Sequence, residues 1–96
     1  MPVPVDPPGT SPEPADAPDY EDAFEAVTRV IGWYQKRILE ETRAAEPDTR
    51  LLARLTTERR ACAADRRVLE RADPEQVATI AAAYEARWKE LTRQEP

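Results

Sequence analysis

The chain has 96 residues, a formal net charge of −5, one cysteine and no histidine. A single cysteine excludes an intramolecular disulfide, and the lack of histidine excludes Cys/His metal sites and every triad that needs an imidazole base. No apolar run approaches the length of a membrane span or a signal-peptide core, so we expect one small domain in the cytoplasm, with no membrane partner.

Charge is unevenly distributed along the chain. The first 28 residues contain seven acidic and no basic residues, whereas the remainder contains twelve acidic and fourteen basic residues. An acidic front end would be repelled by phosphates, so nucleic acid is not favoured as a partner. The basic residues concentrate in the middle of the chain, at Arg50, Arg54, Arg59, Arg60, Arg66, Arg67 and Arg71.

Residues 1–19 contain seven prolines, and their only large aliphatic residues are Val3 and Val5. Such a segment has too little apolar area to offset the entropy lost on ordering, so we expect a disordered acidic tail with polyproline II character. It serves either as an entropic tail or as an arm that a partner orders.

The next segment has the clearest helical pattern in the chain. Asp19 is placed to cap the helix, and Pro47 disfavours helical geometry in the residue before it, so a helix is expected over about 19–45. Spacings of three and four residues put one apolar stripe on its surface. The stripe consists of Tyr20, Phe24, Val27, Ile31, Tyr34 and Ile38.

Two further helices are predicted, over about 48–71 and 74–92. Asp73 as cap, Pro74 at the first helical position and Gln76 reaching back to the cap form a strong start for the last helix. The middle stripe is Leu51, Leu52, Leu55, Cys62 and Leu69, and the last stripe is Val77, Ile80, Ala81, Tyr84, Trp88 and Leu91.

Short connections make successive helices antiparallel neighbours, which predicts an all-α, up-down-up antiparallel three-helix bundle over residues 20–96. Each stripe is expected to face a shared axis. The residues predicted to be buried are Phe24, Val27, Ile31, Ile38, Leu55, Leu69, Ile80, Tyr84 and Trp88.

The sequence contains no pattern typical of an enzyme. The only glycines are Gly9 and Gly32, which rules out a glycine-rich phosphate loop. Cys62 lies on a core stripe, where a thiol behaves as a small hydrophobic group. A bundle of this size offers no deep pocket. We therefore expect no catalytic residue, no cofactor and no metal.

The start of the first helix is the first candidate binding surface. Four carboxylates and two rings lie within two turns, at Asp19, Tyr20, Glu21, Asp22, Phe24 and Glu25. This cluster is either a solvated helix start that suits the helix dipole, or an acidic plug that enters a basic, phosphate-binding cleft of a partner.

Trp33 is the second candidate. It lies about 135° from the stripe of its helix, beside Arg29 and Gly32. The indole either stacks along the helix on Arg29 or Arg37, or anchors a protein interface. Gly32 costs about 1 kcal/mol of helix stability, which a close approach by another backbone would explain.

In outline, Tyr20 to Leu91 is similar to the epsilon-type antitoxins of bacterial toxin–antitoxin systems, which are small acidic three-helix bundles. The resemblance implies a partner that is a kinase-like zeta toxin with a P-loop. It also implies that the acidic and aromatic side chains of the first helix block the nucleotide site of that partner. The long proline-rich segment departs from the family. The competing interpretation is a structural or adaptor protein that self-associates, as a homo-oligomer, through its helical faces.

Overall fold

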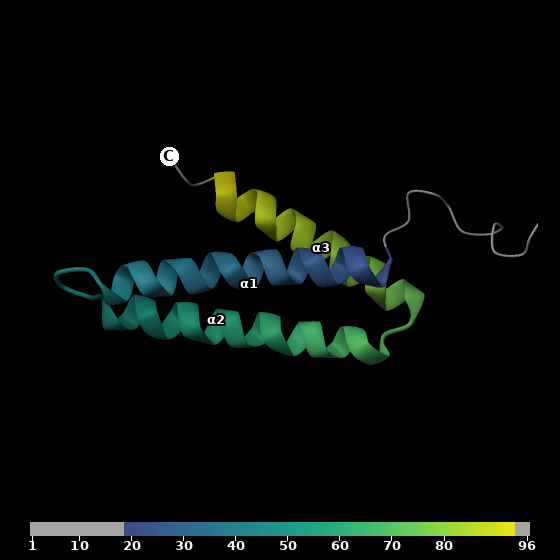
Figure 1. The fold of residues 1–96 in the computed structure, drawn as a ribbon, viewed down its shortest axis with the longest axis horizontal. Helices are drawn as coiled ribbons and strands as arrows, with labels where there is room; N and C mark the ends of the chain where they lie inside the picture. Colours follow the sequence, from purple (N-terminus) through teal and green to yellow (C-terminus); the bar gives the residue numbers. More distant parts are fainter. Residues whose placement is uncertain (1–18, 94–96) are drawn as a thin grey trace, which may run out of the picture.

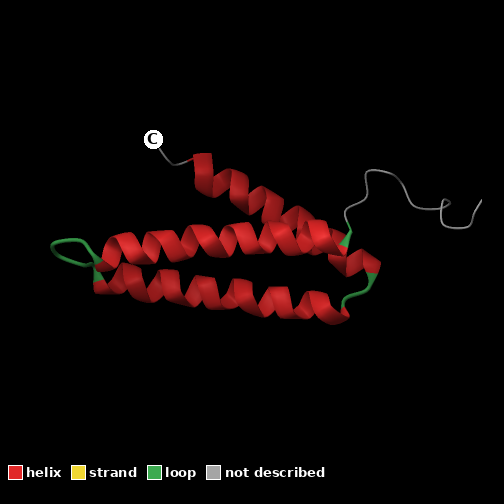
Figure 2. Ribbon diagram, viewed as in Figure 1, coloured by secondary structure: helices red, strands yellow, loops and turns green. Residues whose placement is uncertain are grey.

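The computed structural model describes residues 19–93 and shows three α-helices (Figures 1 and 2). They are α1 (Tyr20–Thr42), α2 (Thr49–Val68) and α3 (Pro74–Arg93), and a 3-10 turn, η2 (Leu69–Arg71), extends α2. Helices account for 88% of the described residues, among which there is no strand, so the predicted all-α three-helix fold is confirmed. The disorder predicted for residues 1–19 falls on residues 1–18, which lie outside the described residues, and on Asp19, which is described and caps α1.

The predicted helix starts are present as reciprocal caps. Asp22 N–H donates to Asp19 Oδ1 at 2.9 Å, and Asp19 N–H donates back to Asp22 Oδ2 at 3.3 Å. Gln76 N–H donates to Asp73 Oδ1 at 2.8 Å, and Asp73 N–H donates to Gln76 Oε1 at 3.2 Å. Each pair satisfies amides that the first turn of a helix leaves without partners.

The first helix ends at Thr42, about three residues before the predicted end near Ala45. Thr42 Oγ1 donates back to the Ile38 carbonyl at 2.7 Å, and the Glu41 carboxylate accepts the Asp48 amide at 2.9 Å. These side chains give the backbone alternatives to helical hydrogen bonds, so the loop begins upstream of Pro47.

Helix α1 is the central element of the bundle. Its backbone packs closely along both α2 and α3, whereas the backbones of α2 and α3 hardly approach each other. Figure 1 shows α2 running antiparallel along α1, while α3 diverges from α1 and ends well short of the α1–α2 loop. The three helices therefore do not share the single axis that we predicted, because α1 has a partner on each of two sides.

The central position of α1 widens and rotates its buried surface. Ala23, Ala26 and Val30 are buried together with the predicted Val27 and Ile31, so the buried arc is about 140° wide at 100° per residue. The spacing of large apolar residues predicted the burial of Val27 and Ile31. It did not predict the burial of the small residues Ala23 and Ala26, which form much of the interface of α1 with its two partner helices. The whole core consists of Ala23, Ala26, Val27, Val30, Ile31, Tyr34, Leu55, Cys62, Leu69, Val77, Ala81 and Tyr84.

Four of the nine residues predicted to be buried are not. Phe24 is exposed, and Ile38, Ile80 and Trp88 are half-buried at the edge of the core. Phe24 faces the half-buried Arg66 of α2, whose guanidinium carbon lies 5.4 Å from the centre of the phenyl ring. Ile38 lies in the last turns of α1, near the α1–α2 loop.

Candidate protein-binding site

Seven of the eight candidate residues lie at the cap and in the first three turns of α1. Tyr20 and Phe24 are 44% and 37% exposed, and their ring centroids lie 6.0 Å apart. Arg66 covers the phenyl ring of Phe24 and donates a 3.1 Å hydrogen bond to Thr28 Oγ1. Phe24 is therefore packed against α2, and Tyr20 contacts Phe24.

The four carboxylates around these rings have two different roles. Asp19 and Asp22 form the reciprocal cap of α1, so each is committed to the helix start. Glu21 and Glu25 are exposed and form no ion pair with any residue from 19 to 93. We define the acidic-aromatic end by the residues Asp19, Tyr20, Glu21, Asp22, Phe24 and Glu25.

Arg29 adjoins the acidic-aromatic end and connects it to α3. Its guanidinium carbon lies 5.5 Å from the ring centroid of Trp88. With Phe24, Glu25 and Thr28, it lines a shallow hollow of about 330 Å³. An exposed apolar ring, a carboxylate and a hollow next to them are suited to a partner surface that is basic and partly apolar.

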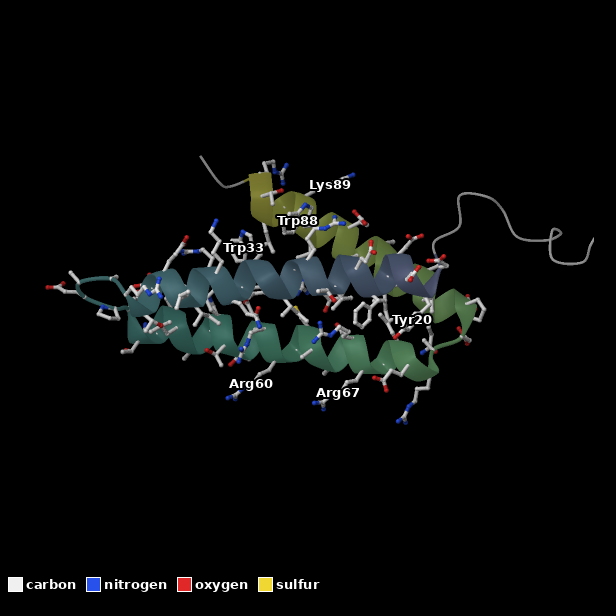
Figure 3. The ribbon with its side chains drawn as sticks, in the orientation of Figure 1. Tyr20, Trp33, Arg60, Arg67, Trp88 and Lys89 are labelled. Atoms are coloured by element: carbon white, nitrogen blue, oxygen red, sulfur yellow. The ribbon has the colours of Figure 1, made fainter. Side chains whose placement is uncertain are left out.

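Trp33 lies apart from this surface, in a cleft of about 730 Å³ toward the loop end of the hairpin. Leu51 and Leu55 of α2 and Leu91 of α3 line the same cleft. Trp33 is half-buried, packs against the core, and makes an edge-to-face contact with Tyr34 at 5.2 Å. In Figure 3, Trp33 and Trp88 both lie between α1 and α3.

The position of Trp33 corrects our expectation that it lies off the core. The sequence pattern predicted that Trp33 lies on the solvent side of α1. Because α3 diverges from α1, there is space between the two helices for the indole of Trp33. The predicted stacking on Arg37 is present, with the guanidinium carbon 6.0 Å from the ring centroid, whereas Arg29 stacks on Trp88 instead.

No atom lies within 4 Å of a Cβ placed on Gly32, so the bundle itself provides no close backbone approach there.

Sequence analysis missed a polar cluster between α2 and α3. Tyr84 Oη donates to Asp65 Oδ2 at 2.5 Å, and Arg87 Nη1 donates to Cys62 Sγ at 3.2 Å. These residues are 19 and 25 positions apart in sequence, so no local pattern could have revealed the pairing. Burial, followed by the hydrogen bond to Asp65, raises the pKa of Tyr84 above its ordinary value.

The polar cluster is structural in character. Cys62 is fully buried, which keeps its thiol away from any substrate, as expected for a core cysteine.

Within residues 19–93, no group of three or more His, Cys, Asp or Glu residues is arranged to hold a metal ion. No helix in this part of the chain combines the length and the apolar character that a membrane crossing requires.

Comparison of the chain with protein-family models, with characterised proteins and with solved structures gave no match.

Proposed function

We propose that this protein is a non-catalytic binding module that neutralises a partner enzyme in the cytoplasm. Its acidic-aromatic end covers a basic nucleotide- or phosphate-binding cleft of that enzyme. The observation that carries the proposal is the exposed ring pair Tyr20–Phe24, which is surrounded by carboxylates on a capped helix end.

The two components of this surface contribute differently to binding. Unpaired carboxylates at Glu21 and Glu25 attract a basic cleft over long range and accelerate association. The rings of Tyr20 and Phe24 supply apolar area that is desolvated on contact, which slows dissociation. A kinase-like enzyme is the partner class implied by the resemblance to epsilon-type antitoxins, and its phosphate site would provide the positive charge.

The test compares two double variants of the full chain as bait for proteins from its own cells. Glu21→Lys with Glu25→Lys reverses two charges without touching the cap residues, and Tyr20→Ala with Phe24→Ala removes the rings. Glu46→Lys with Glu85→Lys is the matched control, since both residues are exposed and form no ion pair with any described residue. Mass spectrometry then identifies proteins retained by the wild type and the control but lost by both test variants.

The proposal expects such a protein to be an enzyme, with the product of the neighbouring gene as the first candidate. Its activity should fall as the wild-type chain is added. The Lys variant should slow association roughly tenfold at low salt, and the Ala variant should mainly accelerate dissociation. If the captured proteins are the same for all four baits, the binding surface lies elsewhere and the proposal is wrong.

The alternative, self-association, has two observations in its favour. Apolar side chains form part of the lining of the cleft at Trp33, and Leu39, which does not line that cleft, is 48% exposed. In that case the mass measured by sedimentation should rise with concentration, and Leu39→Glu should hold the chain as a monomer.

A further inference from the structure

The outward surface of α2 and η2 carries five exposed arginines: Arg50, Arg54, Arg60, Arg67 and Arg71. At 100° per residue, the four in α2 lie within an arc about 140° wide, and Arg71 continues the row into η2. The row is roughly 31 Å long at 1.5 Å per residue. Figure 3 shows Arg60 and Arg67 projecting away from the bundle. We call this surface the arginine face.

Within its 140° arc the arginine face contains no acidic residue, and the exposed Glu70 of η2 lies about 60° outside that arc, next to Arg67. The acids Glu58 and Asp65 are half-buried, and their carboxylates interact with Tyr34 and Tyr84 on the inner side of α2. None of the five arginines forms an ion pair with a residue from 19 to 93. Like charges four residues apart, such as Arg50 and Arg54, destabilise a helix by a few tenths of a kcal/mol, whereas Arg67 and Arg71 are favourably placed at the C-terminal end of α2 and η2.

Short side chains form a ridge between the arginines. Ala53, Thr57, Ala61 and Ala64 are all exposed and follow one another along the middle of the arginine face. Small residues allow a second helix to approach closely, at interaxial distances of about 8 Å. The arginines on either side of the ridge can then reach the flanks of that helix.

We propose that the arginine face docks an acidic α-helix of a partner protein. Small or apolar side chains of that helix lie along the ridge, and its Asp and Glu side chains pair with the arginines. Arginine suits this role because its planar guanidinium binds a carboxylate through two parallel hydrogen bonds. This surface is separate from the acidic-aromatic end and opposite to it in charge.

Two other occupants are less compatible with the surface. A nucleic acid would meet a chain of net charge −5, and a ridge of alanines offers no hydrogen bonds to bases or phosphates. In a second copy of this chain, the acids of α1 lie only in its first two turns and at its end, at Glu40 and Glu41, and the turns between them carry Arg29, Lys36 and Arg37. A second copy therefore cannot line the whole face with carboxylates.

The experiment titrates the full chain with a fluorescent synthetic helix of roughly 21 residues, long enough to cover the face. The helix has alanine and leucine on one side and glutamate on both flanks. A peptide of the same composition with its helical pattern scrambled, and a short DNA duplex, are titrated at the same salt concentration. Fluorescence anisotropy reports binding, and sedimentation reports the mass of the chain alone.

Three variants separate the contributions. Arg60→Glu with Arg67→Glu should weaken binding of the helix at least about tenfold. Arg43→Glu with Lys89→Glu changes the net charge equally at exposed positions outside the face and should leave binding within about threefold. Ala61→Phe keeps every charge but places a bulky side chain on the ridge, which should prevent close approach of a second helix. It should therefore weaken binding of the patterned helix and leave binding of the scrambled peptide unchanged.

The proposal requires tighter binding of the patterned helix than of the scrambled peptide or the DNA. Equal binding of both peptides, or tighter binding of DNA that Ala61→Phe does not change, would identify a general polyanion surface and overturn it. Absence of binding to any probe also overturns it. A dimer that the Arg60/Arg67 variant dissociates would make a second copy the occupant, against the proposal.

Discussion

The hydroxyl group of Tyr84 donates a hydrogen bond to the carboxylate of Asp65, and this contact joins α3 directly to α2. Arg87 adds a second connection, because it reaches Cys62 and also lies 5.0 Å over the ring of Tyr84. The backbones of α2 and α3 hardly approach each other, so these side chains, together with the packing of both helices on α1, determine where α3 lies. No buried side-chain nitrogen or oxygen within residues 19–93 lacks a partner.

We predict that stability is lost in alkali as the two buried tyrosines ionise. Burial, followed by the hydrogen bond to Glu58, raises the pKa of Tyr34 from 10.0 to about 12. A phenol with a raised folded-state pKa contributes stability that is present below pH 10.0 and is lost as pH rises toward 12. The pKa of Tyr84 is also raised, so the stability that it contributes likewise begins to be lost above pH 10.0 and continues to fall as pH rises.

Urea unfolding measured at intervals from neutral pH to pH 12 should therefore show a flat region followed by a decline. In Tyr34→Phe the decline should be shallower, since one of the two ionising groups is gone. An equally steep decline in that variant would show that Tyr34 is not responsible.

A pair of leucine truncations tests the core. Leu55 is buried, so Leu55→Ala should cost ~2–5 kcal/mol and leave a domain this small largely unfolded. Leu39 is 48% exposed, so Leu39→Ala should change the free energy of unfolding by less than about 0.5 kcal/mol. Thermal melts of the two variants provide the comparison. Equal melting temperatures would mean that the buried surface of α1 and α2 is misassigned.

Gly32→Ala should stabilise the free protein. Nothing lies within 4 Å of a Cβ at this position, and alanine is favoured over glycine inside a helix by about 0.5–1 kcal/mol. For a domain of this size that raises the melting temperature by several degrees, roughly 4–8 °C per kcal/mol. A lower melting temperature would contradict the open space seen here. A raised melting temperature with weaker partner binding would show that a partner backbone uses Gly32.

Trp33→Ala should weaken the fold, contrary to what the sequence pattern indicates. The indole is half-buried and packs on Tyr34, so we expect a loss of about 1–3 kcal/mol, below the 3–5 kcal/mol of a fully buried tryptophan. The fluorescence of the remaining Trp88 can follow urea unfolding of both proteins. Unchanged stability would place Trp33 outside the packed core.

The sequence could predict the helices and their starts because both depend on residues that lie within one or two turns of each other. The caps at Asp19 and Asp73 depend on residues three apart, and the helical spacing of apolar residues depends on one turn, so both are visible in a short window. These signals determine the three helices and the up-down-up order.

The orientation of the helices depends on contacts that no short window contains. Phe24 has the spacing of a core residue, yet it faces Arg66 from another helix and stays exposed. Ala23 and Ala26 carry little apolar signal, yet they are buried because α1 has partners on two sides. For the candidate site, the sequence treated the acidic-aromatic end and Trp33 as two separate surfaces, but it could not show that Trp33 packs against the core, because that contact depends on the position of α3.

Because α1 is central, substitutions in different helices should combine differently in their effects on stability. Structurally the molecule consists of two helix pairs, α1 with α2 and α1 with α3, that share one member. Energetic effects of distant substitutions in α2 and α3 should therefore simply add, except where Asp65 and Cys62 meet Tyr84 and Arg87. Substitutions of the buried residues of α1 should instead influence both pairs at once, so their energetic effects should not add to those of changes in either partner helix.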